Sequence, residues 1–316
     1  MTLHINTIGG GSGQPPVIIG LVKLFHDMDI DINAIVGTWD SGGSSGKLRD
    51  LYGIMPPGDI LKCIMAFTPP ENRNLTNILL RRFDSTYSKI YNHNAGNMLL
   101  TALQKETSPI AAIRSLEKIT NAKGHVYPIT ETDTDLKAEM TRVKSVIVNN
   151  EKEIGERLKN GYKITKLWLE NGNGKYPALN ALKNTDILII SPGSIFTSII
   201  PHFTIDEIRR TCKKIPIKII CANFVERTLI ADEFIDAMNI WTGIEPTHAI
   251  FNSTPITVDT YKNNGLDPLV IPKDCEISGV QCTARPIIKN YRNLIRHDPK
   301  RTAAAIFEIL SKEGKI

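Results

Sequence analysis

The sequence has few cysteines, and their positions argue against small disulfide-stabilised proteins and zinc-binding proteins. There are five in 316 residues, none in a C-x-x-C pair: Cys63, Cys212, Cys221, Cys275 and Cys282. An odd number at such wide spacing does not favour a disulfide framework or a zinc site. We therefore expect reduced and mostly buried thiols, as in a cytoplasmic protein.

Long apolar runs and strong charge are also absent. No stretch approaches the roughly 18 apolar residues that a membrane-spanning helix needs, and the N-terminus MTLHINTIGG has no basic leader. The 38 basic and 33 acidic residues leave a net charge of only +5, and no basic cluster is interleaved with aromatics. This composition predicts no membrane span and no nucleic-acid partner, and it mildly favours anionic ligands.

The best-known catalytic and nucleotide-binding fingerprints are missing as well. The sequence has no G-x-S-x-G, no H-E-x-x-H and no G-x-x-x-x-G-K-[ST]. The glycine run INTIGGGSGQPP, residues 5–16, fails the dinucleotide pattern G-x-G-x-x-G, because Gln14 or Pro16 stands where the third glycine belongs. A phosphate-binding loop and a tight turn without a ligand both remain open for this run.

What the sequence does contain is an alternation of strand and helix patterns. A strand at residues 3–8 precedes the glycine run and a helix at 16–27, and a strand at 32–39 precedes the small-residue loop 41–46. Helical patterns follow at 71–90 and 93–103, further strands at 185–190, 217–224, 247–253 and 269–272, and a capped helix after Asp298. Such alternation predicts a parallel sheet with crossover helices.

Residues 125–175 have a different texture, with short strand-like pieces between polar or glycine turns. We predict an α/β protein with a three-layer Rossmann-like parallel-sheet core, built from residues 1–124 and 176–316. Residues 125–175 would form a small β-rich insertion.

Polar residues gather where the predicted strands end, and ligands of open α/β sheets bind outside those carboxyl ends. The candidates for ligand binding are Gly10, Gly11, Ser12, Gly13, Asp40, Ser44, Ser45, Asn97, Gly193, Ser194, Thr197 and Asn223. Asp40 would hold a ribose hydroxyl or a phosphate-bound metal, or else cap a helix, and Arg49 would pair with a phosphate. Asp59, in PPGDI, is either a helix cap or a second metal ligand.

Five segments occur together in an order typical of one family: GGGSG, WDSGGSSGKLRDLYGIMPPGDI, HNAGN, ISPGSIFTSIIPHF and RHDPKRTAAAIFEIL. With them, nearly the whole chain resembles the YvcK/CofD-like proteins. These include bacterial gluconeogenesis factors and, more distantly, 2-phospho-L-lactate transferases. The long second segment is more similar to the gluconeogenesis-factor branch.

The resemblance implies a Rossmann-like fold with a small inserted domain and a nucleotide ligand, either a UDP-sugar or an NAD-type dinucleotide. It also implies a regulatory role in gluconeogenesis and cell morphogenesis, with no enzymatic activity established for that branch. In the transferase branch, acidic residues at the positions of Asp40 and Asp59 serve a magnesium ion. This chain departs from the family pattern at Ser41, where a second aspartate is usual, at Gln14, and at residues 224–232.

Two functions follow as hypotheses. The first is a cytoplasmic, non-catalytic protein that binds a nucleotide or nucleotide-sugar. The alternative is a magnesium-dependent phosphoryl or nucleotidyl transferase in which Asp40 and Asp59 hold the metal. The failed fingerprint disfavours a nicotinamide oxidoreductase. The exposed sheet edge of this architecture is compatible with a homodimer, and the sequence names neither the base, the sugar nor a protein partner.

Overall fold

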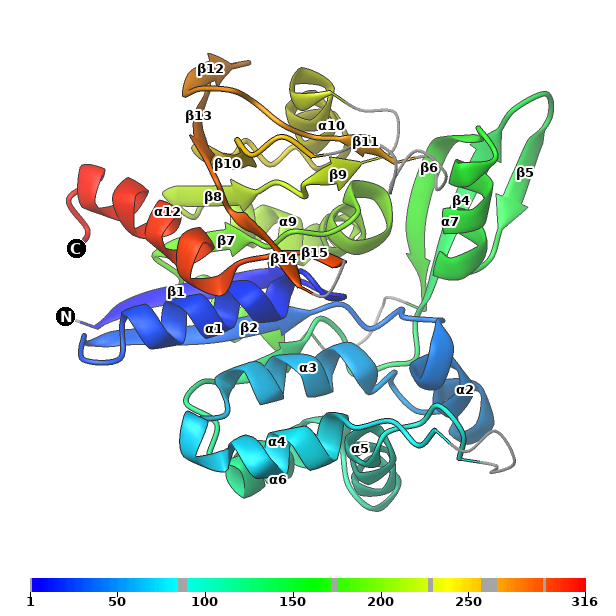
Figure 1. The fold of residues 1–316 in the computed structure, drawn as a ribbon. Coiled ribbons are helices and arrows are strands. Elements are labelled where there is room, and N and C mark those ends of the chain that lie inside the picture. Colours follow the sequence, from blue (N-terminus) through cyan, green and yellow to red (C-terminus); the bar gives the residue numbers. More distant parts are fainter. Residues whose placement is uncertain (1, 85–89, 172–175, 227–229, 257–265, 292–293) are drawn as a thin grey trace.

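A computed structural model describes residues 2–84, 90–171, 176–226, 230–256, 266–291 and 294–316 (Figure 1). Its centre is an eight-stranded sheet in the order β12-β13-β10-β8-β7-β1-β2-β3. The strands are β1 (Leu3–Gly9), β2 (Ile30–Val36), β3 (Val126–Pro128), β7 (Ile187–Ile190), β8 (Ile217–Cys221), β10 (His248–Asn252), β12 (Cys275–Ile277) and β13 (Val280–Arg285). All neighbours run parallel except β12 and β13. The predicted α/β class with a mostly parallel sheet is confirmed.

The order of the strands reverses in the middle of the sheet. From β1 the chain builds outward through β2 to β3, and from β7 it builds the other way through β8, β10 and β13. The loops after β1 and β7 therefore leave the sheet side by side and separate to opposite faces. In open α/β sheets this switch point is where a ligand-binding crevice forms.

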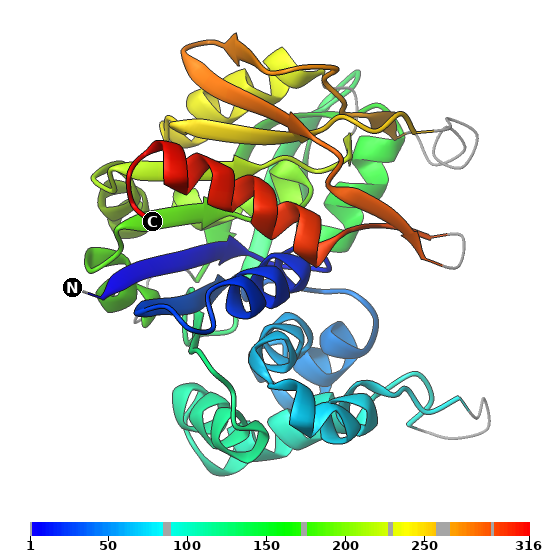
Figure 2. The ribbon, with the colours of Figure 1, turned by 60° about the vertical axis from the view of Figure 1, so that its left-hand side comes forward.

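Helices cover both faces of the sheet, and the alternation of side chains along the strands produces one apolar core on each face (Figures 1 and 2). On one face α1 (Gln14–Leu24) packs between α3 (Gly58–Phe67) and α12 (Pro299–Lys312), over Ile5 and Ile32. On the other face Ile8 and Ile35 belong to the core with residues of α8 (Ala178–Lys183), α9 (Asp206–Lys213) and α10 (Ala231–Thr242). The result is three layers.

A helical lobe follows β2 and forms the lower part of the molecule in Figures 1 and 2. Beside α3 it contains α2 (Gly43–Tyr52), a 3₁₀ turn (Pro70–Asn72), α4 (Arg73–Leu80), α5 (Ala95–Glu106) and α6 (Pro109–Thr120). The helix predicted for 71–90 ends at Leu80, and residues 85–89 of that prediction lie outside the described residues.

A second, smaller sheet carries the insertion. Its order is β5-β4-β6, made of β4 (Asp135–Thr141), β5 (Ser145–Val148) and β6 (Lys163–Glu170). One helix, α7 (Glu151–Lys159), packs on β4, and our prediction of a β-rich insertion named no helix here. Its sequence does carry helix-end residues, since Asn150 caps the N-terminus and basic residues occupy the last turn. Residues 126–128, which we grouped with the insertion, pair with β2 in the large sheet.

Two small antiparallel pairs complete the carboxyl edge of the large sheet. They join β9 (Val225–Glu226) to β11 (Asp267–Pro268), and β14 (Ile288–Tyr291) to β15 (Leu294–His297). After β7 come a π-helical turn (Ile195–Ile199) and a 3₁₀ turn (Ile200–Thr204). Four of the five cysteines are buried and Cys275 is exposed. Among the described residues, no helix combines the length and apolarity needed to cross a membrane.

Candidate functional site

The glycine loop after β1 lies directly against the loop after β7. A Cβ atom on Gly13 would stand 1.9 Å from the carbonyl oxygen of Pro192, so only glycine allows the two loops to approach this closely. Gly11 has a φ of +67°, a left-handed conformation that glycine adopts without strain. The glycine run is therefore required by the geometry of the switch point itself.

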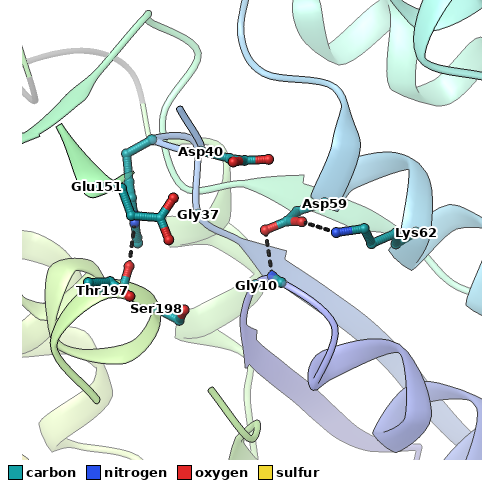
Figure 3. Close-up of a pocket in the computed structure, with 10 residues that line it drawn as sticks. Gly10, Gly37, Asp40, Asp59, Lys62, Glu151, Thr197 and Ser198 are labelled. Atoms are coloured by element: carbon teal, nitrogen blue, oxygen red, sulfur yellow. Dashed lines mark hydrogen bonds and ion pairs between the residues drawn. The ribbon is translucent and has the colours of Figure 1, made fainter. Parts of the chain in front are cut away.

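The side chain of Asp59 accepts a hydrogen bond from the backbone of this glycine loop. The backbone N–H of Gly11 donates to Asp59 Oδ2, and Lys62 Nζ lies 2.7 Å from Asp59 Oδ1 (Figure 3). The first turn of α1 contributes little to anion binding, because Pro15 and Pro16 have no N–H. A phosphate at this loop would therefore be met by the neighbouring loops and by Lys62, or it would displace Asp59.

Three carboxyl groups from three parts of the chain converge beside this loop (Figure 3). Asp40 follows β2, Asp59 lies in the first turn of α3, and Glu151 opens helix α7 of the insertion. Burial, and next the charge of Asp59, raises the pKa of Asp40. Burial, followed by the charges of Asp40 and Asp59, raises the pKa of Glu151 to about 8. The three acidic groups therefore lie close enough together that Glu151 keeps its proton near neutral pH, with Lys62 as a neighbouring cation.

The chemistry of these donors is compatible with a magnesium ion only if a ligand completes the coordination. Among the residues that the structure describes, no group of three or more His, Cys, Asp or Glu side chains is arranged to hold a metal by itself. Mg²⁺ is commonly bound by one or two carboxylates together with substrate phosphates. Asp40 and Asp59 fit that arrangement, since both line the same small cavity.

Three adjoining cavities share residues along the carboxyl edge of the sheet. The central cavity, about 130 Å³, is lined by the carboxylates with Gly10, Gly11, Thr197 and Ser198. A second cavity of about 410 Å³ shares Asp40 and Lys62 with it and extends toward the helical lobe. A third of about 320 Å³ shares Gly10, Gly11 and Ser198 and extends toward β15. Together they form an extended groove across the switch point.

The twelve residues predicted for ligand binding all line this groove. Thr197 lines the central cavity; Ser44, Ser45 and Asn97 line the second; Ser12, Gly13, Gly193, Ser194 and Asn223 line the third; Gly10, Gly11 and Asp40 each line two. Arg49 does not belong to the set. It is buried and pairs with Asp133 and with Asp135, the latter at 2.7 Å, so it ties α2 to the insertion and is not free for a phosphate.

The third cavity ends on a buried histidine that sequence analysis missed. His297 is 4% exposed, and neither ring nitrogen has a hydrogen-bond partner among the described residues. Burial lowers the pKa of His297 to about 4, so the ring is neutral near pH 7. Its ring centre lies 5.2 Å from that of Phe224. This end of the groove therefore offers an aromatic wall and unused polar nitrogens.

Trp39 joins the loop after β2 to the turn after β7. Its indole Nε1 donates to the carbonyl oxygen of Thr197 at 2.7 Å, and its ring meets His202 edge to face at 4.7 Å. His202 is fully buried, and burial lowers its pKa to about 4.

Two further residues of the site were not predicted from the sequence. Lys62 could have been found from its i+3 spacing to Asp59, whereas Glu151 comes from the insertion through a tertiary contact that no local pattern shows.

Comparison with known proteins agrees with this geometry. Residues 5–288 match the model of a family described as 2-phospho-L-lactate transferase CofD. The chain belongs to the CofD family. It is 32% identical to the gluconeogenesis factor of Listeria monocytogenes, over 98% of this chain and 96% of that protein. It is 28% identical to the gluconeogenesis factor of Bacillus subtilis, over 98% of both chains.

A solved structure supports the fold of this CofD-family chain. A UPF0052-family protein from Bacillus halodurans superposes with a TM-score of 0.85 at 25% sequence identity, covering 96% of this chain and 99% of that one. The family resemblance drawn from the sequence motifs is thereby confirmed.

Proposed function

We propose that this CofD-family protein binds a nucleotide or nucleotide-sugar in the three-cavity groove and acts as a regulatory factor of the gluconeogenesis-factor type. The relatives' names carry the regulatory part of this proposal. The ligand part rests on the groove itself. Its polar loops lie at the sheet's switch point, where α/β folds bind phosphorylated ligands.

The shape and polarity of the groove support an extended ligand. The third cavity supplies the glycine backbone, Ser194, Asn223 and the wall of Phe224 and His297, a combination suited to a ring with polar edges. The second cavity supplies hydroxyl and amide groups with two cations, Lys62 and Arg82. A phosphate-linked molecule spanning both would place its charge near Lys62.

A thermal-unfolding panel tests this proposal. UDP-glucose, UDP-N-acetylglucosamine, NAD, GTP and CDP are each added with and without Mg²⁺. A bound ligand raises the unfolding temperature through RT ln(1 + [L]/Kd). A binder is stabilised by at least one nucleotide without metal, and Asn223→Ala reduces the shift. Absence of any shift with every nucleotide overturns the proposal.

A second function, magnesium-dependent phosphoryl or nucleotidyl transfer, is favoured by one observation. The buried carboxyl of Asp40 has a raised pKa next to Asp59, which is the electrostatic environment that a divalent cation relieves. In that case a nucleotide stabilises the protein only with Mg²⁺, and Asp40→Asn removes both the stabilisation and turnover. If a nucleotide stabilises the protein equally with and without Mg²⁺, and also stabilises Asp40→Asn, then phosphoryl or nucleotidyl transfer at this site is ruled out.

A further inference from the structure

Ser44, at the start of α2, lies between two polar side chains of the segment that opens α5. Its Oγ is 2.8 Å from His93 Nδ1 and 3.0 Å from Asn97 Nδ2. An amide N–H can only donate, so Asn97 donates to Ser44, and the hydroxyl of Ser44 donates to His93 in the tautomer whose Nδ1 carries no proton. Burial, and next the charges of Lys47 and Arg82, lowers the pKa of His93, which keeps the imidazole a neutral acceptor.

Asn97 also carries a buried oxygen atom, Oδ1, that has no hydrogen-bond partner among the described residues. Asn97 is 2% exposed and lines the second cavity. Leaving a buried amide oxygen unpaired is unfavourable, and a link that served only to join α2 to α5 would not require it. This oxygen is therefore an available acceptor, beside Ser44, for a ligand that donates a hydrogen bond.

The walls of the second cavity favour an electrophile that carries negative charge. Lys62 and Arg82 contribute cations, and Asp40 stands in the same wall. Ser44 is the second residue of α2, a ten-residue helix whose N-terminal end carries partial positive charge. Both features stabilise phosphoryl oxygens next to the Ser44 hydroxyl.

We propose that Ser44 is a nucleophile that accepts a phosphoryl group from a ligand in the second cavity, with His93 as its general base and Asn97 as the positioning residue. A serine hydroxyl within hydrogen-bond reach of a neutral histidine is the arrangement that activates serine nucleophiles, and here Asn97 positions the hydroxyl itself. The inference rests on the proposed function, because the phosphoryl donor is the bound nucleotide.

The step balances with a nucleoside di- or triphosphate as the donor. Ser44 Oγ attacks the terminal phosphorus, a new P–O bond forms, and the bridging P–O bond breaks with its electron pair leaving on the nucleotide. The hydroxyl proton passes to His93 Nδ1 and then to the departing phosphate oxygen. The products are phosphoserine and a nucleotide shortened by one phosphate.

The first test is the intact mass of the full chain after incubation with UDP or ATP and Mg²⁺. We expect the wild type to gain the mass of one HPO₃, with fragmentation placing it on Ser44. Ser44→Ala removes the adduct, and His93→Gln slows its formation about a hundredfold or more, the low end of general-base effects. Ser115→Ala, on α6 away from the groove, leaves it unchanged.

The second test does not depend on a nucleotide. A fluorophosphonate forms a Ser–O–P bond and releases fluoride only at an activated serine, so we expect the wild type to be labelled at Ser44 and His93→Gln to be labelled more slowly. Peptide mapping of the labelled wild type needs no variant, which keeps the test valid if Ser44→Ala folds poorly.

The outcomes separate the two proposals. Nucleotides that stabilise the fold but leave no phosphate on Ser44 overturn this inference and leave the proposed function intact. If no nucleotide stabilises the fold, the proposed function fails, and the absence of fluorophosphonate label on Ser44 then overturns the activation of Ser44 as well. An adduct on another residue also overturns it.

Discussion

The hydroxyl of Ser41 accepts a hydrogen bond from the backbone N–H of Lys152 at 3.2 Å. Lys152 lies in the first turn of α7, so Ser41 holds the insertion against the loop after β2. The insertion in turn supplies Glu151 to the central cavity. Ser41 therefore positions the helix that brings the carboxyl group of Glu151 to the central cavity.

Glu151 makes stability depend on pH between about pH 4.5 and pH 8. Its pKa is raised to about 8 in the fold from an ordinary value of 4.5, so the folded state binds more protons than the unfolded state between these values. Stability is therefore fully present below pH 4.5 and is lost as the pH rises through 8. We expect Glu151→Gln to gain on the order of 1–3 kcal/mol relative to wild type between pH 5 and pH 8, measured by urea unfolding.

The matched control for this prediction is Glu156→Gln, an exposed position on the same helix. It removes the same charge without burial, so its pH profile should follow the wild type. If Glu151→Gln and Glu156→Gln have the same profile, Glu151 is not the source of the dependence.

His297 makes the opposite contribution on the acid side. Its pKa falls to about 4 in the fold from 6.5, so the unfolded state binds more protons between these values. Stability is present above pH 6.5 and is lost as the pH falls toward 4, by up to about 3 kcal/mol. His297→Gln should flatten this part of the unfolding free-energy curve, whereas His26→Gln, at an exposed site, should not. Parallel curves for wild type and His297→Gln would contradict the assignment.

Arg49 should be intolerant of lysine. Its guanidinium reaches Asp133 through Nε and Asp135 through Nη2, and an ammonium cannot satisfy both carboxylates in that geometry. Because Arg49 is 5% exposed while its partners are partly solvated, we expect Arg49→Lys to cost about 1–3 kcal/mol of unfolding free energy. Arg209→Lys, in a surface pair with Asp206, should change it by less than about 0.5 kcal/mol. Equal effects of the two substitutions would mean that the burial of Arg49 does not increase its contribution to the unfolding free energy.

Gly13 should be intolerant of alanine. Its Cβ would overlap the carbonyl oxygen of Pro192, so Gly13→Ala must move the loops apart, at a cost of about 2 kcal/mol or more. Gly155→Ala on α7 is the control, because nothing lies within 4 Å of its added methyl group, and helix propensity predicts a gain of about 0.5–1 kcal/mol. Thermal unfolding measures both, and a neutral Gly13→Ala would show that the loops tolerate separation.

The sequence predicted those parts of the protein that local patterns encode. The β1 strand, the glycine loop and the proline-marked start of α1 are consecutive, so their residue types alone indicate them. The strand-end rule then places Asp40, Gly193 and Asn223 at one edge, because parallel strands end together. The motifs also identified the family.

What the sequence could not predict depends on contacts between distant segments. Glu151 enters the site only because α7 packs against the loop after β2, and Arg49 finds Asp133 and Asp135 across the insertion boundary. Asp59 was read as a cap or a metal ligand, while its contact with Gly11 joins residues 48 positions apart. The helix at 151–159 was missed because the strand-like runs on either side of it dominate the pattern.

The central cavity of the groove is the smallest of the three, with about 130 Å³ between chambers of about 410 and 320 Å³. An occupant that fills it has the outline of a dumbbell, with two bulky ends and a slender joint beside Lys62. Small compounds that bind the two chambers separately would occupy them at the same time, and a short anionic linker would turn such a pair into one inhibitor. For ligand discovery, compounds can therefore be screened separately against each of the two larger chambers, and the separation of the chambers sets the length of the linker.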